Sequence, residues 1–317
     1  MMRADFSAYR RRKPRTSSVE RSLILKSMPG FADLSGAELA LLASFARERR
    51  FSPGDVLLTP GQPVQKFFLI VDGEVEMFLG GQSVGRFSSR TSVGGLASLA
   101  RDPRGAHAIA RSPVLALEMD AEEMEEFFED NSNLIIGVLG ALARGVRELQ
   151  EERGGPAIDG PEYPDYPVTS GLTLVDKMFL MRTTSNFREV SIEALAELAE
   201  GAHEAHFRAG ATLWRRGDLA DHYYMIVAGT LVATSPGAPP RTFTSRWLVG
   251  GLDNMGRLPR WYDLRAETDT VALRLRSTVL YDVLEDYPDM GLRMLRALSR
   301  GALALQERKL TDGTARD

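Results

Sequence analysis

Few residues of this chain have the types and spacing of a catalytic or metal-binding site. The sequence contains no cysteine, which excludes disulfides, thiolate metal sites and cysteine nucleophiles. His203 and His206 have a spacing that occurs in metal sites, but no third ligand accompanies them, so we interpret them as surface or core histidines. The glutamates from Glu118 to Glu129 are typical of a solvated helix face rather than of a carboxylate dyad. Without a nucleophile–base pair, a Walker loop or a zinc signature, we expect no enzymatic activity, no metal site and no cofactor.

An internal repeat is the strongest signal in the sequence. Adding 156 to a residue number in the first half gives its counterpart in the second half, without a gap from residues 19–149 to residues 175–305. The glycines and Pro-Arg dipeptides that coincide at this offset are Gly54 with Gly210, Gly61 with Gly217, Gly73 with Gly229, Gly94-Gly95 with Gly250-Gly251, and Pro103-Arg104 with Pro259-Arg260. Because glycine is needed where the backbone turns or approaches closely, the two halves share turns and therefore a fold.

Each unit reads as a helix, a small antiparallel β-roll and further helices. Ser35 and Glu38 form a capping box that opens a helix. Short strands with glycine turns follow, including a hairpin signal over residues 66–76 with Asp72-Gly73 at its turn. Such strands predict a rolled or closed antiparallel sheet. The expected fold class is therefore α+β, with two tandem antiparallel, jelly-roll-like β-roll domains that are each flanked by helices.

The last helix of each unit carries a heptad seam. Apolar residues step by four, three, four and three within 132–153, and the pattern returns within 289–309. These residues are Ile135, Leu139, Leu142, Val146 and Leu149, and then Leu295, Leu298, Ala302 and Leu305. Because such a seam must be covered by another helix, we expect the two helices to pack together in a pseudo-two-fold arrangement. A homodimer that pairs like helices across two chains is the alternative.

These signals divide the chain into five segments. They are a basic arm at 1–18, a first domain at 19–153, a linker rich in Pro and Gly at 154–174, a second domain at 175–309 and a tail at 310–317. We expect the arm to be disordered and to act as a solubilising tail. Two alternatives stay open, because its run from Arg10 to Arg15 also suits anionic lipid or nucleic acid, or a kinase substrate or inhibitory segment at Ser18.

The bulk composition adds only weak limits. The chain has 317 residues and a net charge of −4, so no global electrostatic reason favours nucleic acid. It shows neither an apolar run of membrane-spanning length nor the apolar stretch of a secretory signal. We therefore expect a cytoplasmic protein without a transmembrane segment.

The paired segments that run from the glycines to the Pro-Arg dipeptides resemble the ligand segment of the cyclic-nucleotide-binding domain family. This is the family of the catabolite activator protein and of the regulatory subunits of cAMP-dependent protein kinase, and its phosphate-binding cassette is similar to F-G-E-L-A-L, a spacer, and P-R-A-A-T. Here the segment reads VGGLASLARDPRGAH from Val93 and VGGLDNMGRLPRWY from Val249. The spacing from the Glu position to the Arg is that of the family in both copies.

The resemblance implies a cyclic nucleotide as the ligand of the first domain. The implied ligand-binding residues are Gly94, Gly95, Leu96, Ala97, Ser98, Arg104, Gly105 and Ala106. Amides at the helix turn and the Arg104 guanidinium would bind the cyclic phosphate, although a structural role for Arg104 stays open. Gly95 stands where the family has a ribose-binding Glu, a loss of roughly 1–3 kcal/mol. We therefore expect weak binding of a nucleotide, or none.

The second copy departs further from the family. Its degenerate pocket comprises Gly250, Gly251, Arg260, Trp261 and Tyr262. We expect the two rings to close the pocket from inside, with stacking on a base as the alternative. We interpret Arg260 as a structural residue bound to backbone carbonyls or to a carboxylate such as Asp253 or Asp263.

The implied function is regulatory. We expect a non-enzymatic sensor or adaptor that acts through a protein partner. The alternatives are a cyclic-nucleotide-responsive regulatory subunit of a protein kinase and a cAMP receptor-type regulator without its own DNA-binding domain. Because only twelve residues follow Leu305, we expect no helix-turn-helix and no sequence-specific DNA binding.

Overall fold

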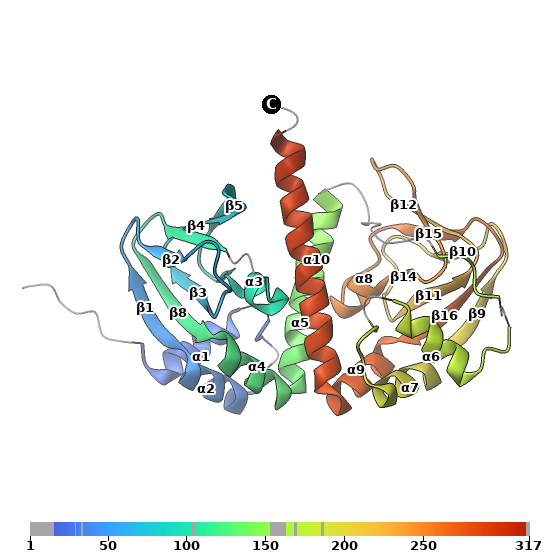
Figure 1. The fold of residues 1–317 in the computed structure, drawn as a ribbon, viewed down its shortest axis with the longest axis horizontal. Coiled ribbons are helices and arrows are strands. Elements are labelled where there is room, and N and C mark those ends of the chain that lie inside the picture. Colours follow the sequence, from blue (N-terminus) through green and yellow to red (C-terminus); the bar gives the residue numbers. More distant parts are fainter. Residues whose placement is uncertain are drawn as a thin grey trace, which may run out of the picture.

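The computed structural model shows two β-rolls on either side of a central pair of long helices (Figure 1). It describes the backbone of residues 16–28, 30–32, 34–102, 106–152, 163–167, 170–184 and 187–314, and the side chains of these residues as far as 307. The expected arm as far as residue 15, most of the expected linker, the last three residues of the tail, and the implied binding residues Arg104 and Gly105 lie outside the described residues.

The first domain begins and ends with helices and places its strands between them. Its helices are α1 (Ser18–Lys26), α2 (Gly36–Phe45), α3 (Gly95–Ala100), α4 (Ala121–Glu129) and α5 (Ser132–Glu152). Its strands are β1 (Arg47–Phe51), β2 (Val56–Leu58), β3 (Lys66–Asp72), β4 (Val75–Leu79), β5 (Gln82–Phe87), β6 (Ser92–Val93), β7 (His107–Ala110) and β8 (Val114–Asp120).

The second domain repeats this order of elements. Its helices are α6 (Leu174–Arg182), α7 (Ile192–Glu200), α8 (Gly251–Met255), α9 (Ser277–Asp286) and α10 (Pro288–Thr314). Its strands are β9 (His203–Phe207), β10 (Thr212–Trp214), β11 (His222–Ala228), β12 (Leu231–Thr234), β13 (Arg241–Phe243), β14 (Leu248–Val249), β15 (Asp263–Ala266) and β16 (Thr270–Arg276). The offset of 156 read from the sequence therefore relates whole elements as well as residues.

Capping boxes set the starts of several helices. The Glu38 N–H donates to Ser35 Oγ at 3.2 Å and the Ser35 N–H to Glu38 Oε2 at 2.7 Å, which forms the capping box expected before α2. Ser17 and Thr173 form two further boxes, so α1 and α6 each begin one residue before the expected domain starts.

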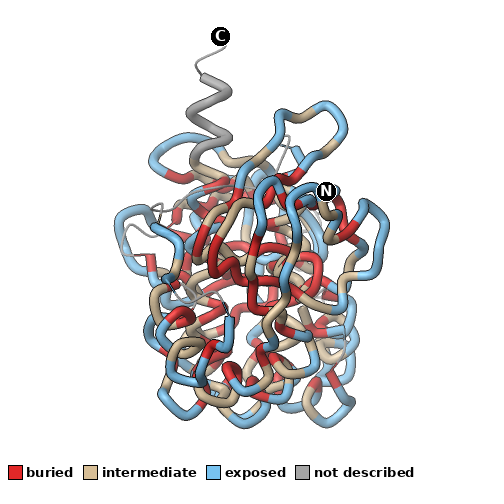
Figure 2. Tube along the Cα trace, turned by 90° about the vertical axis from the view of Figure 1, so that its right-hand side faces the viewer, coloured by how far each residue is buried: buried red, intermediate tan, exposed pale blue. Residues whose placement is uncertain are grey.

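Each roll consists of two antiparallel sheets with the same strand order. The orders are β1-β8-β3-β6 and β2-β7-β4-β5 in the first domain, and β9-β16-β11-β14 and β10-β15-β12-β13 in the second. Leu69 lies opposite Leu117, and their counterparts Met225 and Leu273 are paired in the same way. In both pairings the register shifts just beyond this point. The expected tandem β-roll fold is confirmed, and Figure 2 shows buried residues gathered inside the second roll while the outer loops are exposed.

The two long helices α5 and α10 pack against each other, as the heptad seams predict (Figure 1). Val146, Ala302 and Leu305 are buried together in this seam. Each long helix also contacts the short helix of the other domain, because α10 packs on α3 and α5 packs on α8. Leu303 of α10 joins the apolar core of the first roll. The two domains are thus joined through α5 and α10, each of which packs on both domains.

No helix in the described part of the chain is long and apolar enough to cross a membrane.

Candidate functional site

The first glycine-led segment forms a tight turn into the short helix α3. Gly94 has φ +89° and precedes the helix, which begins at Gly95. The positive φ favours glycine there, and an added Cβ would lie 2.8 Å from Leu58 Cδ1, at the flexible end of that side chain. The amides of Gly95, Leu96 and Ala97 occupy the first turn, where an α-helix leaves its N–H groups without intrahelical partners. The structure thus brings Gly94 through Ser98 together in one turn, while Ala106 is buried directly before β7.

The Ser92 side chain lies against Gly95, at the position where the family carries an acidic residue. A Cβ built on Gly95 would collide with Ser92 Oγ. The counterpart Gly251 meets only Met255 Cε at 3.9 Å. In the first domain, Ser92 therefore occupies the direction in which a glutamate side chain would begin.

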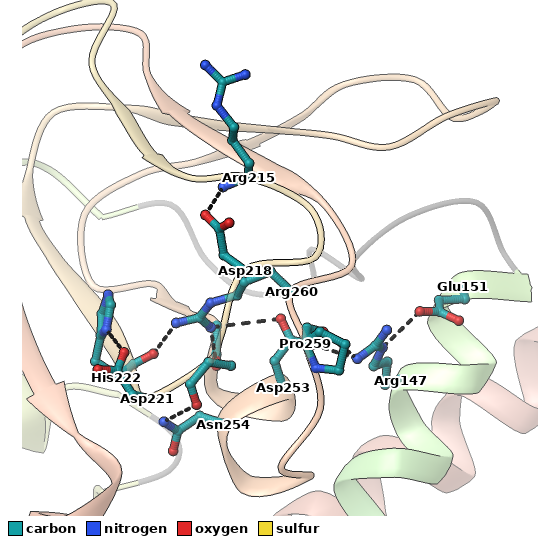
Figure 3. Close-up of polar contacts among 12 residues, drawn as sticks. Arg147, Glu151, Arg215, Asp218, Asp221, His222, Asp253, Asn254, Pro259 and Arg260 are labelled. Carbon is teal, nitrogen blue, oxygen red and sulfur yellow. Dashed lines mark hydrogen bonds and ion pairs between the residues drawn. The ribbon is translucent and has the colours of Figure 1, made fainter.

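Arg260 of the second segment is buried, and Figure 3 shows its polar contacts with neighbouring residues. Its Nη1 donates to the Gly250 carbonyl at 2.9 Å, and its Nη2 donates to the His222 carbonyl. Its guanidinium carbon lies 3.9 Å from the centre of the Trp214 ring, which adds a cation–π contact. Gly250 must be glycine, because a Cβ there would overlap with Arg260 Nη1 and lie 2.9 Å from Trp214 Cη2.

Asp253 on α8 supplies the carboxylate beside this arginine. Its Oδ2 lies 3.8 Å from Arg260 Nη1, and its Oδ1 lies 3.4 Å from Nη1 of Arg147. Neither carboxylate oxygen makes a hydrogen bond within the described residues. Burial raises the pKa of Asp253 to about 7, against the lowering effect of the two arginines. Asp263, the other carboxylate considered from the sequence, instead accepts from the Arg216 N–H at 2.7 Å.

Arg147 connects this site to the first domain (Figure 3). It projects from α5, donates from Nη1 to the Pro259 carbonyl at 2.8 Å, and pairs with Glu151 at 2.8 Å. The buried pair of Asp253 and Arg260 is therefore contacted by a cation from the other half of the chain. Such a charge network ties α5 to the second cassette.

The aromatic residues of the second roll fill the space around Arg260. Trp214 stacks on Tyr224 with ring centres 6.0 Å apart and lies 5.7 Å from the Tyr262 ring. Trp261 meets Tyr262 edge-on at 5.3 Å, and both rings are buried. Burial raises the pKa of Tyr262. The rings therefore lie inside the roll among the protein's own side chains.

Two residues of this site were not singled out from the sequence. Trp214 carried one usable signal, because its counterpart at the offset of 156 is the smaller Leu58. Arg147 carried none, because its partner Pro259 lies 112 positions away.

The other candidate residues lie elsewhere. His203 and His206 are exposed on β9, and His206 Nε2 is 3.4 Å from Glu204. The described residues hold no cluster of three or more metal-ligating side chains. Assigning Glu118 to a solvated helix face was wrong, because it is buried on β8 and pairs with Arg49 at 2.5 Å and Lys66 at 3.0 Å.

Comparison with known proteins gives two matches to one family. The sequence model of the cyclic nucleotide-binding domain matches residues 48–131 and 204–287, which together cover just over half of the chain. A cAMP-dependent protein kinase regulatory subunit of Hypocrea atroviridis is 27% identical over 135 residues, which are 43% of this chain and 28% of that protein. An uncharacterized NTE family protein of Mycobacterium bovis is 29% identical over 126 residues, which are 39% of this chain and 22% of that protein. The chain spans less than a third of the length of these relatives.

Among solved structures, the regulatory domain of Toxoplasma gondii PKA with cAMP is 17% identical. That match covers 86% of this chain and 94% of the other chain, with a TM-score of 0.34. The two family matches start 156 residues apart, at the offset that relates the two rolls and their cassette turns. The chain belongs to the cyclic nucleotide-binding domain family and carries two copies of its domain in tandem.

Proposed function

We propose that this protein is a cytoplasmic, non-enzymatic regulator whose first domain binds a cyclic nucleotide weakly and whose second domain is permanently filled by its own side chains. One observation carries the proposal. Arg260, Trp214 and Tyr262 occupy the interior of the second roll, whereas the positions of the two rings hold Leu58 and Ala106 in the first. Family membership supports a cyclic nucleotide as the ligand. The difference between the two rolls supports binding in the first domain and none in the second.

The expected affinity follows from Gly95. A cyclic nucleotide in the first cassette would meet the amides of α3 and the Arg104 guanidinium, but no carboxylate would accept from its ribose hydroxyl. That lost acceptor costs roughly 1–3 kcal/mol, or about 5- to 150-fold in affinity. We therefore place the affinity well below that of a site with the family's glutamate.

The route from the first cassette to the rest of the molecule runs through Glu125. Arg101 ends α3 and donates to Glu125 Oε2 at 2.6 Å. Arg296 of α10 donates to the other oxygen of the same carboxylate at 2.5 Å. Since α10 also packs directly on α3, a ligand that moves α3 acts on the central helix pair. We propose that this helix pair presents the response to a protein partner.

A protein kinase is the second candidate for that partner's class. The observation that favours it is the matching relative, which is a regulatory subunit of a cAMP-dependent protein kinase. In this version, the ligand at the first domain controls the release of a catalytic subunit. If the protein is instead an adaptor, the ligand and the helix pair act in the same way, and the partner is a protein other than a kinase.

Titration calorimetry with cAMP, cGMP and the open-chain monophosphate AMP tests the ligand assignment. We expect weak saturable binding of a cyclic nucleotide at one site per chain, and no binding of AMP. Arg104→Ala should lower the affinity by roughly 2–4 kcal/mol, which removes measurable binding. Arg260→Ala should leave the affinity unchanged while it lowers stability.

The outcomes separate the alternatives. A folded Arg104→Ala protein that binds like the wild type would place the ligand elsewhere. Two bound nucleotides per chain would contradict the filled second pocket. If the wild type binds no cyclic nucleotide, the sensor role is rejected and regulation rests on protein contacts alone.

A further inference from the structure

A large cavity lies in the first domain between the roll and helices α3, α4 and α5. Its volume is about 900 Å³, which is within the range of small-molecule sites. Buried side chains of Phe31, Phe67, Met124 and Phe128 line it, and Leu142 of α5 forms part of the opposite wall. These walls are therefore mainly apolar.

The second domain provides an internal comparison, because a cavity that several of the counterpart residues line has a volume of only about 180 Å³. Larger side chains fill the space there. Met294 replaces Val138, and Trp247 replaces Thr91. Apolar surface left in contact with water is unfavourable by roughly 25 cal/mol per Å². The chain fills most of this space in one copy and leaves it open in the other.

The charges at the edge of the cavity limit the occupant's head group. Arg90 is exposed there, has φ +68°, and makes no side-chain hydrogen bond or ion pair within the described residues. The other arginine at the edge, Arg101, is already paired with Glu125. In the second domain, the counterpart Arg246 lies 4.5 Å from the centre of the Tyr163 ring. Among the described cations at this edge, Arg90 is thus the one without a partner in the described part of the chain.

The same edge also carries acidic residues. Glu122 of α4 and Glu148 of α5 are exposed beside the cavity. They repel a doubly charged phosphate head more strongly than a single carboxylate, since the repulsion scales with the charge. Among anions, this edge therefore favours a single negative charge next to Arg90, whose guanidinium fork matches a carboxylate.

We propose that the first domain binds a long-chain fatty acid in this cavity, with the acyl chain between the phenylalanine and methionine side chains and the carboxylate at Arg90. The ligand would lie against Leu96 and Leu99 of α3 and next to Glu125. The cavity shares Gly95 to Ser98 of α3 with the implied nucleotide site, and its occupant would reach the contact between α3 and α10.

Titration of the full chain with hexadecanoate below its self-association concentration tests the cavity. One molecule should bind per chain. Val138→Met and Thr91→Trp place the second domain's own residues in the first cavity, and the double variant should lose at least about tenfold in affinity. Both residues are accommodated at the counterpart positions, and circular dichroism checks that the variants fold. The absence of saturable binding by the wild type, or unchanged binding by the folded double variant, would overturn the proposal.

The head group is tested separately. Arg90→Asn removes the cation and keeps a residue that tolerates the left-handed conformation. It should weaken hexadecanoate binding about tenfold and leave hexadecanol binding unchanged. Arg246→Asn, at the counterpart position, is the matched control and should change neither. If the wild type binds hexadecanol as tightly as hexadecanoate, the carboxylate assignment is wrong. Cyclic-nucleotide titration of the double variant should match the wild type, which separates this site from the phosphate-binding one.

Discussion

Replacement of Asp253 by asparagine tests whether the second pocket holds a carboxylate that is costly to ionise. Burial raises the pKa of Asp253 to about 7 in the folded protein, whereas an unfolded aspartate titrates near 4. Between these two values the folded state binds more protons than the unfolded state. The free energy of unfolding therefore falls as the pH rises, by at most about 1.4 kcal/mol per pH unit. The full stabilisation is present below about pH 4 and is lost as the pH passes about 7.

The magnitude follows from the gap between the two pKa values. Three units correspond to about 4 kcal/mol between the acidic and neutral limits. Asparagine has nearly the same size and cannot ionise, so Asp253→Asn should remove this pH dependence. At pH 8 the variant should be more stable than the wild type by roughly 2–4 kcal/mol, since its amide donors face Arg147 and Arg260 and offset part of the gain.

Tryptophan fluorescence in urea is a selective assay, because Trp214, Trp247 and Trp261 all lie in the second domain. Unfolding curves of both proteins between pH 5 and pH 8 give the difference in stability at each pH. Other carboxylates titrate in both proteins and cancel in this difference. Asp282→Asn, at an exposed position on α9, controls for the loss of one charge. A difference that does not change with pH, or a variant that is less stable at pH 8, would refute the reasoning.

Two further substitutions probe the same region. Arg147→Ala should lower the free energy of unfolding by roughly 1–3 kcal/mol and speed amide exchange in α8, because the Pro259 carbonyl and Asp253 lose a partner. Unchanged exchange in α8 would contradict the link between the two domains. In urea unfolding, Gly250→Ala should lower the free energy of unfolding by at least about 2 kcal/mol more than Gly210→Ala. Both glycines have positive φ, but only Gly250 has Arg260 and Trp214 packed against it. Equal losses would show that the backbone angle alone matters.

The repeat made most of the fold predictable. Glycine restricts what the backbone can do at a turn, so shared glycines at one offset predict shared turns over the whole unit. Gly54 with φ +92° and Gly210 with φ +85° show this at one such pair. The seam on α5 and α10 was predictable for a similar reason, because a heptad pattern defines a helix face that must be covered.

The charged contacts of the site were not predictable in the same way. Alternation along a strand shows which face is buried, but it does not show which distant side chain meets that face. Glu118 illustrates the limit, because its partners Arg49 and Lys66 come from neighbouring strands that lie 69 and 52 positions away. The backbone conformation of Arg90 was not predictable either, since arginine has no preference for the positive φ that it adopts here.

The fused pair gives the two copies a freedom that a symmetric dimer lacks. In a two-chain dimer every substitution appears in both sites, so filling one pocket would fill the other. Here Trp214 and Tyr262 close only the second roll, which still provides α10 as a fixed cover for α3. A ligand in the first domain would therefore act on one interface, the contact between α3 and α10. With one phosphate-binding site per chain, the proposed regulator would bind the cyclic nucleotide without cooperativity between like sites. A symmetric dimer with two open sites can couple them, and this coupling is what cooperativity requires.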